Sequence, residues 1–454
     1  MERRGRGSPL WIGALVATFG LGAAGGGGLC LAADGPRTAC ITLPTDEFSQ
    51  KAAAVLGHLV RENFRRAGEF DLIDTRELLN KGTQDPRLDT IDNAQRLVAR
   101  GKQQYDNLEL DPAIEALSKA RELFRKAVGR LGDGEKYVET LLFLGASHIL
   151  SGDSELGSDA FRQVALFDKR RTLDPKLFPP SMIDIFKRVK SEVAAAPVGM
   201  VQLKSNPPAA EVYLNGVYKG VTPLTLAKVP EGTHFVRLEK DGYLPWGQLV
   251  DFFATHEERV EATLQASAGL EQFKKRAAKL LGDLDEDPPK PAIVQFGQWL
   301  GVDRLVVLQV KQRGSEVNAE ALLAQIEPPK KLAHRSAKFD FTNANFMARS
   351  DAFSTSLYRQ VELPPAGGGG GESDGGGGGA LAVAQCNSDS DCALGEICDR
   401  ASGTCVPEGP RGDAIYEKWW FWTIVGGVAV VGAGTGVLTW YLLQPEQGAI
   451  EFTF

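Results

Sequence analysis

The sequence predicts a multidomain α+β protein with a helical-repeat segment, a small β-sandwich, flanking α/β segments and one C-terminal transmembrane helix. The chain has 454 residues, which is too long for a single hydrophobic core. Apolar residues recur at helical spacing over residues 90–195 but alternate with polar residues, between turn signals, over residues 199–265. Residues 419–443 carry no charge, which is typical of a membrane span. These three observations define the fold class.

Residues 1–33 have the parts of a secretory signal peptide. The first six residues include three arginines, residues 10–24 are apolar, and residues 31–33 resemble a small-residue cleavage site. We therefore expect the body of the protein in the periplasm, or otherwise on the non-cytoplasmic side of a membrane.

Residues 419–443 are predicted to form the membrane anchor. At 1.5 Å per residue they extend about 37 Å, enough to cross a hydrocarbon core of about 30 Å with some tilt. Aromatic residues at both ends form the expected interfacial belts. Gly432 and Gly436 lie four residues apart and predict a helix-packing face; the alternative is that both glycines only face lipid. A short tail, residues 444–454, follows the span.

Two α/β segments flank the middle of the chain, at residues 36–85 and 268–362. The first has a strand–helix–strand pattern, and the second has a helix followed by an apolar strand and its hairpin partner. Together they resemble the two halves of the α/β module of curli-secretion and Tol-type periplasmic proteins. The resemblance implies one split domain with the other segments inserted; the alternative is two unrelated small pieces.

Residues 90–195 are predicted to be helical. Small residues such as Gly101, Ala120 and Gly145 recur where paired helices would approach closely. Their placement resembles tetratricopeptide repeats, although the period of about 45 residues is longer than the usual 34. The resemblance implies two helix pairs and a last helix, with a concave face that binds other envelope proteins. The alternative is a plain helical bundle without a partner.

Residues 199–265 are predicted to be an all-β module whose strands are separated by turn residues. In a two-residue hairpin both central residues need positive φ, which Asn-Gly adopts at least steric cost. The turn residues are Asn215, Gly216, Thr222, Pro223, Pro230, Glu231, Gly232, Gly242 and Tyr243.

These turn motifs, in this order, resemble the PEGA domain, a small β-sandwich of bacterial envelope proteins. The resemblance implies a structural or binding module on the far side of a membrane, without known chemistry. Its ligand is not indicated by the sequence, and cell-wall polysaccharide is one candidate. We expect the module to fold alone, with Asn215 and Gly216 setting its register.

A glycine-rich segment, residues 366–385, is predicted to be a disordered linker, because it cannot bury enough apolar area to offset its chain entropy. A cysteine-rich module, residues 386–405, follows it with Cys386, Cys392, Cys398 and Cys405. Zinc sites usually pair cysteines two to four residues apart, unlike this spacing, so two disulfides in an oxidising compartment are favoured. Four cysteines allow three pairings, and Cys40 would remain unpaired.

Catalytic and cofactor motifs are not found in the sequence. The five histidines lie in different segments without metal-ligand spacing. A net charge of −7 without a basic tract argues against nucleic acid as a partner. We therefore expect no enzyme activity, cofactor or metal, and we interpret the chain as a membrane-anchored binding or assembly scaffold. The alternative is a transmembrane signalling or transport component, which the glycine linker disfavours because a relay needs stiffness.

Overall fold

The structure is a computed structural model that describes residues 35–341, 343, 345–361, 363, 396–399 and 404–407. The predicted signal peptide (1–33), linker (366–385), transmembrane helix (419–443, with Gly432 and Gly436) and tail (444–454) lie outside the described residues. Among the residues that are described, no helix is both long and apolar enough to cross a membrane. Helices and several sheets are both present, so the prediction of a mixed α+β fold is confirmed.

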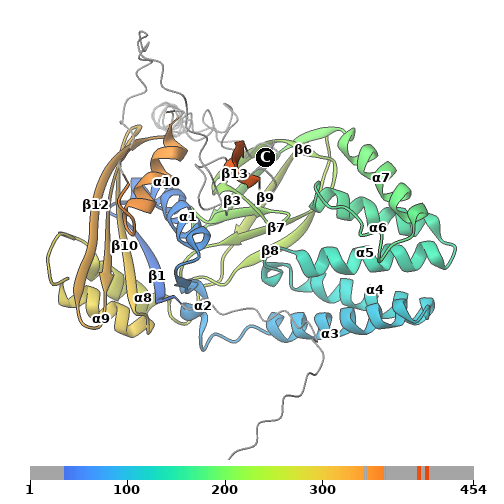
Figure 1. Cartoon of the computed structure of the whole chain (residues 1–454), viewed down its shortest axis with the longest axis horizontal. Helices are drawn as coiled ribbons and strands as arrows, with labels where there is room; N and C mark the ends of the chain where they lie inside the picture. Colours follow the sequence, from blue (N-terminus) through green and yellow to red (C-terminus); the bar gives the residue numbers. More distant parts are fainter. Residues whose placement is uncertain are drawn as a thin grey trace, which may run out of the picture.

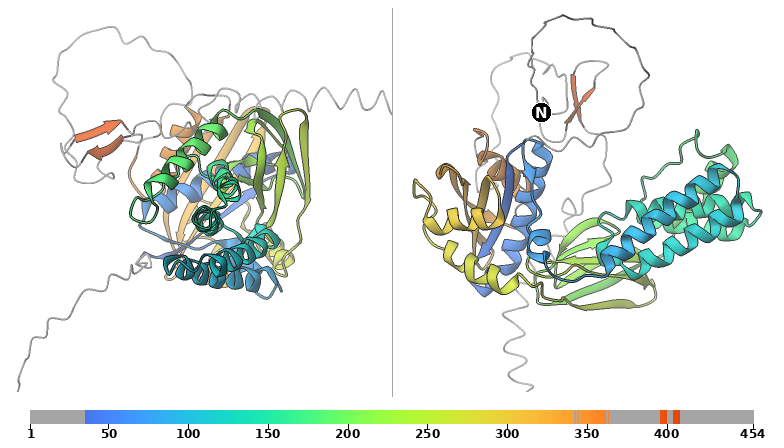
Figure 2. Two further views of the ribbon diagram at one scale, coloured as in Figure 1. Left: turned by 90° about the vertical axis from the view of Figure 1, so that its right-hand side faces the viewer. Right: turned by 90° about the horizontal axis from the view of Figure 1, so that it is seen from below.

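Three parts lie side by side (Figure 1). The α/β domain, at the left of the view, is built from two separate segments, residues 37–80 and 270–356. The β module, residues 198–263, lies in the middle. The helical arm, residues 87–194, extends to the right and touches the rest of the molecule at one end only, as the second panel of Figure 2 also shows.

One five-stranded sheet forms the α/β domain, in the order β12-β11-β10-β1-β2. β1 pairs in parallel with both β10 and β2, and β10, β11 and β12 form an antiparallel meander. The N-terminal and C-terminal segments therefore share one sheet, and the helical arm and β module are inserted between them. The strands are β1 (Arg37–Pro44), β2 (Asp71–Leu72), β10 (Arg304–Arg313), β11 (Glu316–Gln325) and β12 (Lys330–Asp340).

Helices cover both faces of this sheet. α1 (Gln50–Ala67) and α10 (Phe346–Ser356) pack on one face, and α8 (Leu270–Ala277), η3 (Ala278–Leu280) and α9 (Pro291–Leu300) pack on the other. β1 has helices on both sides, which explains why its apolar residues run on without alternating with polar ones. η1 (Glu47–Ser49) follows β1, and α2 (Thr75–Asn80) follows β2.

The helical arm consists of antiparallel helix pairs and a last helix. α3 (Arg87–Asp106) packs on α4 (Leu110–Lys126), and α5 (Glu135–Leu150) packs on α6 (Ser154–Phe167). α7 (Pro180–Ala194) then packs on α6, and η2 (Val128–Arg130) joins the two pairs. Gly101 and Gly145 lie where a Cβ atom would collide with Leu117 and Phe161 of the neighbouring helix. Small residues at these positions therefore permit the close approach of the helices.

The β module consists of two sheets around one apolar core. One sheet has the order β6-β3-β9 and the other β5-β4-β7-β8, with residues such as Val201, Val212 and Val236 between them. The strands are β3 (Val198–Asn206), β4 (Glu211–Leu214), β5 (Val217–Val221), β6 (Leu224–Pro230), β7 (Gly232–Glu239), β8 (Trp246–Phe252) and β9 (Glu257–Thr263).

A short hairpin lies in the cysteine-rich segment. β13 (Glu396–Asp399) pairs with β14 (Thr404–Pro407), and this register places the backbone of Cys398 directly opposite that of Cys405. Cys386 and Cys392 lie outside the described residues.

Candidate functional site

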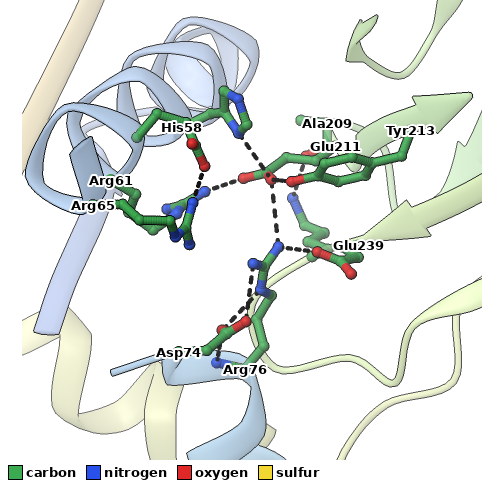
Figure 3. Close-up of polar contacts among 11 residues, drawn as sticks. His58, Arg61, Arg65, Asp74, Arg76, Ala209, Glu211, Tyr213 and Glu239 are labelled. Atoms are coloured by element: carbon green, nitrogen blue, oxygen red, sulfur yellow. Dashed lines mark hydrogen bonds and ion pairs between the residues drawn. The ribbon is translucent and has the colours of Figure 1, made fainter. Parts of the chain in front are cut away.

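The β module meets the α/β domain at a buried cluster of charged and aromatic side chains, which we call the ionic junction (Figure 3). α1, α2 and the strands β4 and β7 each contribute residues to it. Its members are His58, Arg61, Arg76, Glu211, Tyr213, Arg237 and Glu239.

The strand geometry of β4 explains how a charged residue comes to lie here. Successive side chains of a strand point to opposite faces of its sheet. Val212 and Leu214 fill the core of the β module, so Glu211 and Tyr213 point the other way, toward α1. Helix α1 covers this face, and Glu211 is left only 6% exposed.

Glu211 is the centre of the ionic junction. Its carboxylate forms an ion pair with Arg61, and its second oxygen lies 3.4 Å from His58 Nδ1 and 3.4 Å from Arg76 Nη1. The hydroxyl of Tyr213 donates a hydrogen bond of 2.7 Å to the same oxygen. Both carboxylate oxygens therefore have donors, and the second oxygen has them from both the α/β domain and the β module.

Arg76 extends the cluster toward β7. Its guanidinium donates to both oxygens of Asp74, at 3.0 and 3.1 Å, and forms ion pairs with Glu211 and Glu239. Glu239 also pairs with Arg237, whose guanidinium lies 4.3 Å from the centre of the Tyr213 ring. Arg76 thus joins the α/β domain to two strands of the β module.

Electrostatics keep the centre of the junction charged. Burial opposes ionisation of Glu211, but the charges of Arg61 and Arg76, with His58, outweigh it and hold its pKa well below the usual value of 4.5. Burial likewise opposes the charge of Arg76, and Glu211 and Asp74 outweigh it, which raises its pKa well above the usual value. A general base needs a pKa near the working pH. An ionised carboxylate surrounded by donors suits a structural joint instead.

A second junction connects the β module to the helical arm through the predicted Asn-Gly turn. Asn215 and Gly216 have φ of 51° and 78°, the conformation that a two-residue hairpin requires. Asn215 Nδ2 donates to the Leu166 carbonyl of α6 at 3.0 Å. Gly216 lies against the loop before α5, where a Cβ atom would collide with the Asp133 carbonyl oxygen. The turn therefore fixes the position of the arm as well as the strand register.

Phe235 of β7 strengthens this second junction. Its ring is 1% exposed and belongs to the apolar core of the arm, where it meets Phe167 edge-on at 6.3 Å between ring centres. The β module therefore shares a core with the arm. The expectation that it folds alone stays a prediction, and the excised module would expose this ring.

His234 of β7 contacts two of the predicted turn residues, Asn215 and Pro230. His234 Nδ1 lies 2.9 Å from Asn215 Nδ2, and its Nε2 lies 2.8 Å from the Pro230 carbonyl oxygen. Burial lowers the pKa of His234 to about 4, so its ring is neutral at pH 7. Glu231 accepts from the backbone of Ala254, and Gly232 packs against the side chain of Leu166.

The remaining predicted turn residues also make structural contacts, within the module or with neighbouring parts. Thr222 is fully buried and accepts from the Ala210 N–H at 3.0 Å, and the carbonyl of Pro223 accepts from Lys51 of α1 at 3.1 Å. Gly242 has φ of 81°. Tyr243 lines a cavity of about 160 Å³ where all three parts of the molecule meet. Thr222 therefore stabilises the module internally, and Pro223 contacts the α/β domain.

The cysteine prediction can be tested by counting thiols. Cys40 is buried and free on β1, and burial raises its pKa to about 12. The chain has six cysteines, and Cys30 lies in the predicted signal peptide, so five would remain after its cleavage. We expect one free thiol per chain in denatured, unreduced protein, because two disulfides would occupy the other four. The same protein reduced beforehand is the control, and five thiols without reduction would contradict the prediction.

Sequence reasoning did not identify the ionic junction. In the sequence, Glu211 is an ordinary polar residue of a strand with alternating apolar and polar positions. Its partner Arg61 is 150 residues away, so no local pattern connects the two. The one available signal was chemical: two charged residues, Arg237 and Glu239, lie on the same face of β7 two residues apart. Within the described part of the chain, no group of three or more His, Cys, Asp or Glu side chains could hold a metal ion.

Comparison with protein-family models shows that the PEGA domain model matches residues 198–268. No curated protein and no solved structure matches the chain. The matched residues contain all seven strands of the β module. The resemblance predicted from the turn motifs is therefore confirmed for this part of the chain, which is similar to the PEGA domain.

Proposed function

We propose that this chain is a non-catalytic scaffold of a bacterial cell envelope, anchored in a membrane by its C-terminal helix with its body in the periplasm. The signal peptide and the uncharged span at residues 419–443 support this location. The match to the PEGA domain supports a structural or binding module. The glycine-rich linker, 366–385, would tether the body at a variable distance from the membrane.

The observation that carries the proposal is the position of the β module between two other parts. It is joined to the α/β domain by the buried Glu211, and to the helical arm by the half-buried Asn215 and the buried Phe235. The arm extends from this joint and leaves most of its length uncovered (Figures 1 and 2). Such an arm, with helix pairs that resemble tetratricopeptide repeats, suits the capture of envelope proteins. Cell-wall polysaccharide is a further candidate partner.

Site-specific cross-linking in intact cells tests this function. Leu108 and Leu156 are 72% and 49% exposed on the arm, so each can be replaced singly by a photo-cross-linking amino acid. We expect both positions to yield adducts with envelope proteins, because the arm is the proposed binding element.

Leu332, 36% exposed on the α/β domain, is the matched control position. We expect it to give none of the adducts that form at the two arm positions. Absence of adducts at both arm positions, or the same adducts at Leu332, would contradict the scaffold function. Adducts made only with cytoplasmic proteins would contradict the proposed location.

A further inference from the structure

One face of the five-stranded sheet is apolar along one part of its strands and polar along the other. Where α8 and α9 cover it, its side chains are apolar, as at Val307 and Leu322. Beyond these helices the same face carries only polar side chains, and we call this region the polar half-face. Its members are Thr45, Gln309, Lys311, Asn318, Glu320, Ser336 and Lys338.

Strand register brings these residues together from three neighbouring strands. Gln309 lies opposite Glu320, which lies opposite Ser336. One step further, Lys311 lies opposite Asn318, which lies opposite Lys338. Side chains at alternate positions share a face, so these two rows form one continuous polar surface.

A cavity of about 500 Å³ lies over the polar half-face. This volume is within the range of about 300–1,000 Å³ for small-molecule sites. The cavity lies where the parallel pairing of β1 with β10 ends, since Thr45 follows β1 and Lys311 follows the last paired residue of β10. Ligands of open α/β sheets bind outside the carboxyl ends of such strands, where neighbouring strands connect in different directions.

The functional groups that line the cavity indicate which class of ligand it would bind. Protein interfaces have apolar and aromatic centres, whereas this lining consists of amide, hydroxyl, ammonium and carboxylate groups with two alanines and the side chain of Arg349. Lys338 pairs with Glu316 at 3.1 Å and Glu320 with His334 at 2.9 Å, so these two charged lining groups already have partners. A ligand rich in hydroxyl groups matches this mixture of donors and acceptors.

An exposed aromatic ring lies at the same end of the sheet. Phe48 of η1 is 86% exposed, and its neighbour Ser49 accepts a 2.9 Å hydrogen bond from the Gln312 N–H of β10. A single exposed aromatic residue is unremarkable on its own. Phe48 follows the cavity-lining Thr45 by three residues, and its ring offers a flat apolar surface for the C–H face of a sugar ring, whose edge carries the hydroxyls.

We propose that the polar half-face binds a saccharide, with Asn318 and Lys311 as hydrogen-bonding groups and Phe48 as a stacking surface. This site deepens the proposed scaffold function, on which it rests, by giving a saccharide partner a defined place. Capture of envelope proteins by the helical arm is tested separately and does not depend on it.

Calorimetric titration of the full chain, in a detergent without a sugar headgroup, tests the proposal. The probes are a tetramer of N-acetylglucosamine and a tetramer of galacturonic acid, which distinguish neutral from acidic saccharides. We expect saturable binding of at least one. Asn318→Ala should weaken it about two- to tenfold, the value of one hydrogen bond, and Phe48→Ala by a similar factor for the lost stacking.

Phe253→Ala, at an exposed aromatic residue of the β module, and Asn93→Ala, at an exposed residue of α3, are the matched controls and should leave binding unchanged. Phe48 is so exposed that its replacement keeps the test valid even if the Asn318 variant fails to fold. If neither tetramer binds, or if the Phe48 variant binds as tightly as the Phe253 variant, the proposal is overturned.

Discussion

Replacing Glu211 with glutamine is expected to lower the free energy of unfolding by about 3–5 kcal/mol, the usual cost of removing one partner from a buried ion pair. Glutamine keeps the shape of the side chain but removes the charge that compensates Arg61 and Arg76. Both guanidiniums are largely buried and would be left without their central carboxylate. Denaturant unfolding of the full chain in detergent at pH 7 measures the loss.

The control for this variant is Glu261→Gln. Glu261 lies on β9, 71% exposed, 3.7 Å from Lys204. Exposed pairs contribute about 0–1 kcal/mol, so the control should unfold close to the parent. If Glu211→Gln also unfolds within about 0.5 kcal/mol of the parent, a range usual for neutral surface changes, the ionic junction does not stabilise the protein.

The stabilisation that Glu211 provides is expected to depend on pH. The pKa of Glu211 is depressed in the folded protein, so its stabilising effect is complete above the unfolded value of 4.5 and is lost as the pH falls below it. The advantage of the parent over Glu211→Gln should therefore be constant from pH 8 to about pH 5 and shrink in more acidic solution. Repeating the unfolding measurements at intervals down to pH 3 checks this profile.

Local sequence rules were sufficient for the β module. Asn215 and Gly216 must adopt positive φ in a two-residue hairpin, and the structure has this conformation at both positions. The alternation of Val212 and Leu214 with polar residues also predicts which side chains fill the core. These signals act over a few residues, so they can be read without knowledge of the fold.

Long-range pairing could not be read in the same way. The pattern of residues 36–85 predicts a strand at its start, but the parallel partner of this strand, β10, begins at Arg304, and nothing local indicates which strand lies beside it. Likewise, the alternating pattern of β7 assigns Arg237 and Glu239 to a polar face without showing that the face is covered. This face is covered because α2 and the loop between β7 and β8 lie against it, which only the tertiary structure reveals.

Replacing Gly216 with valine is expected to destabilise the full chain through two separate effects. A β-branched residue at φ of 78° is strained by about 1–3 kcal/mol. The added side chain also collides with the Asp133 carbonyl oxygen, and relieving such an overlap costs about another 1–3 kcal/mol. The variant must therefore either keep a strained turn or lose the contact between the turn and the helical arm.

Gly314→Val separates these two effects. Gly314 has φ of 61° in the turn between β10 and β11, and a Cβ atom there meets no other atom within 4 Å. This control carries the backbone strain alone, so Gly216→Val should be less stable than Gly314→Val by the cost of the lost contact. Hydrogen exchange should also be faster around Leu166 and Asp133 in the Gly216 variant only, because these residues face the turn. Equal stability of the two variants, with unchanged exchange at the arm, would show that the turn sets the hairpin without holding the arm.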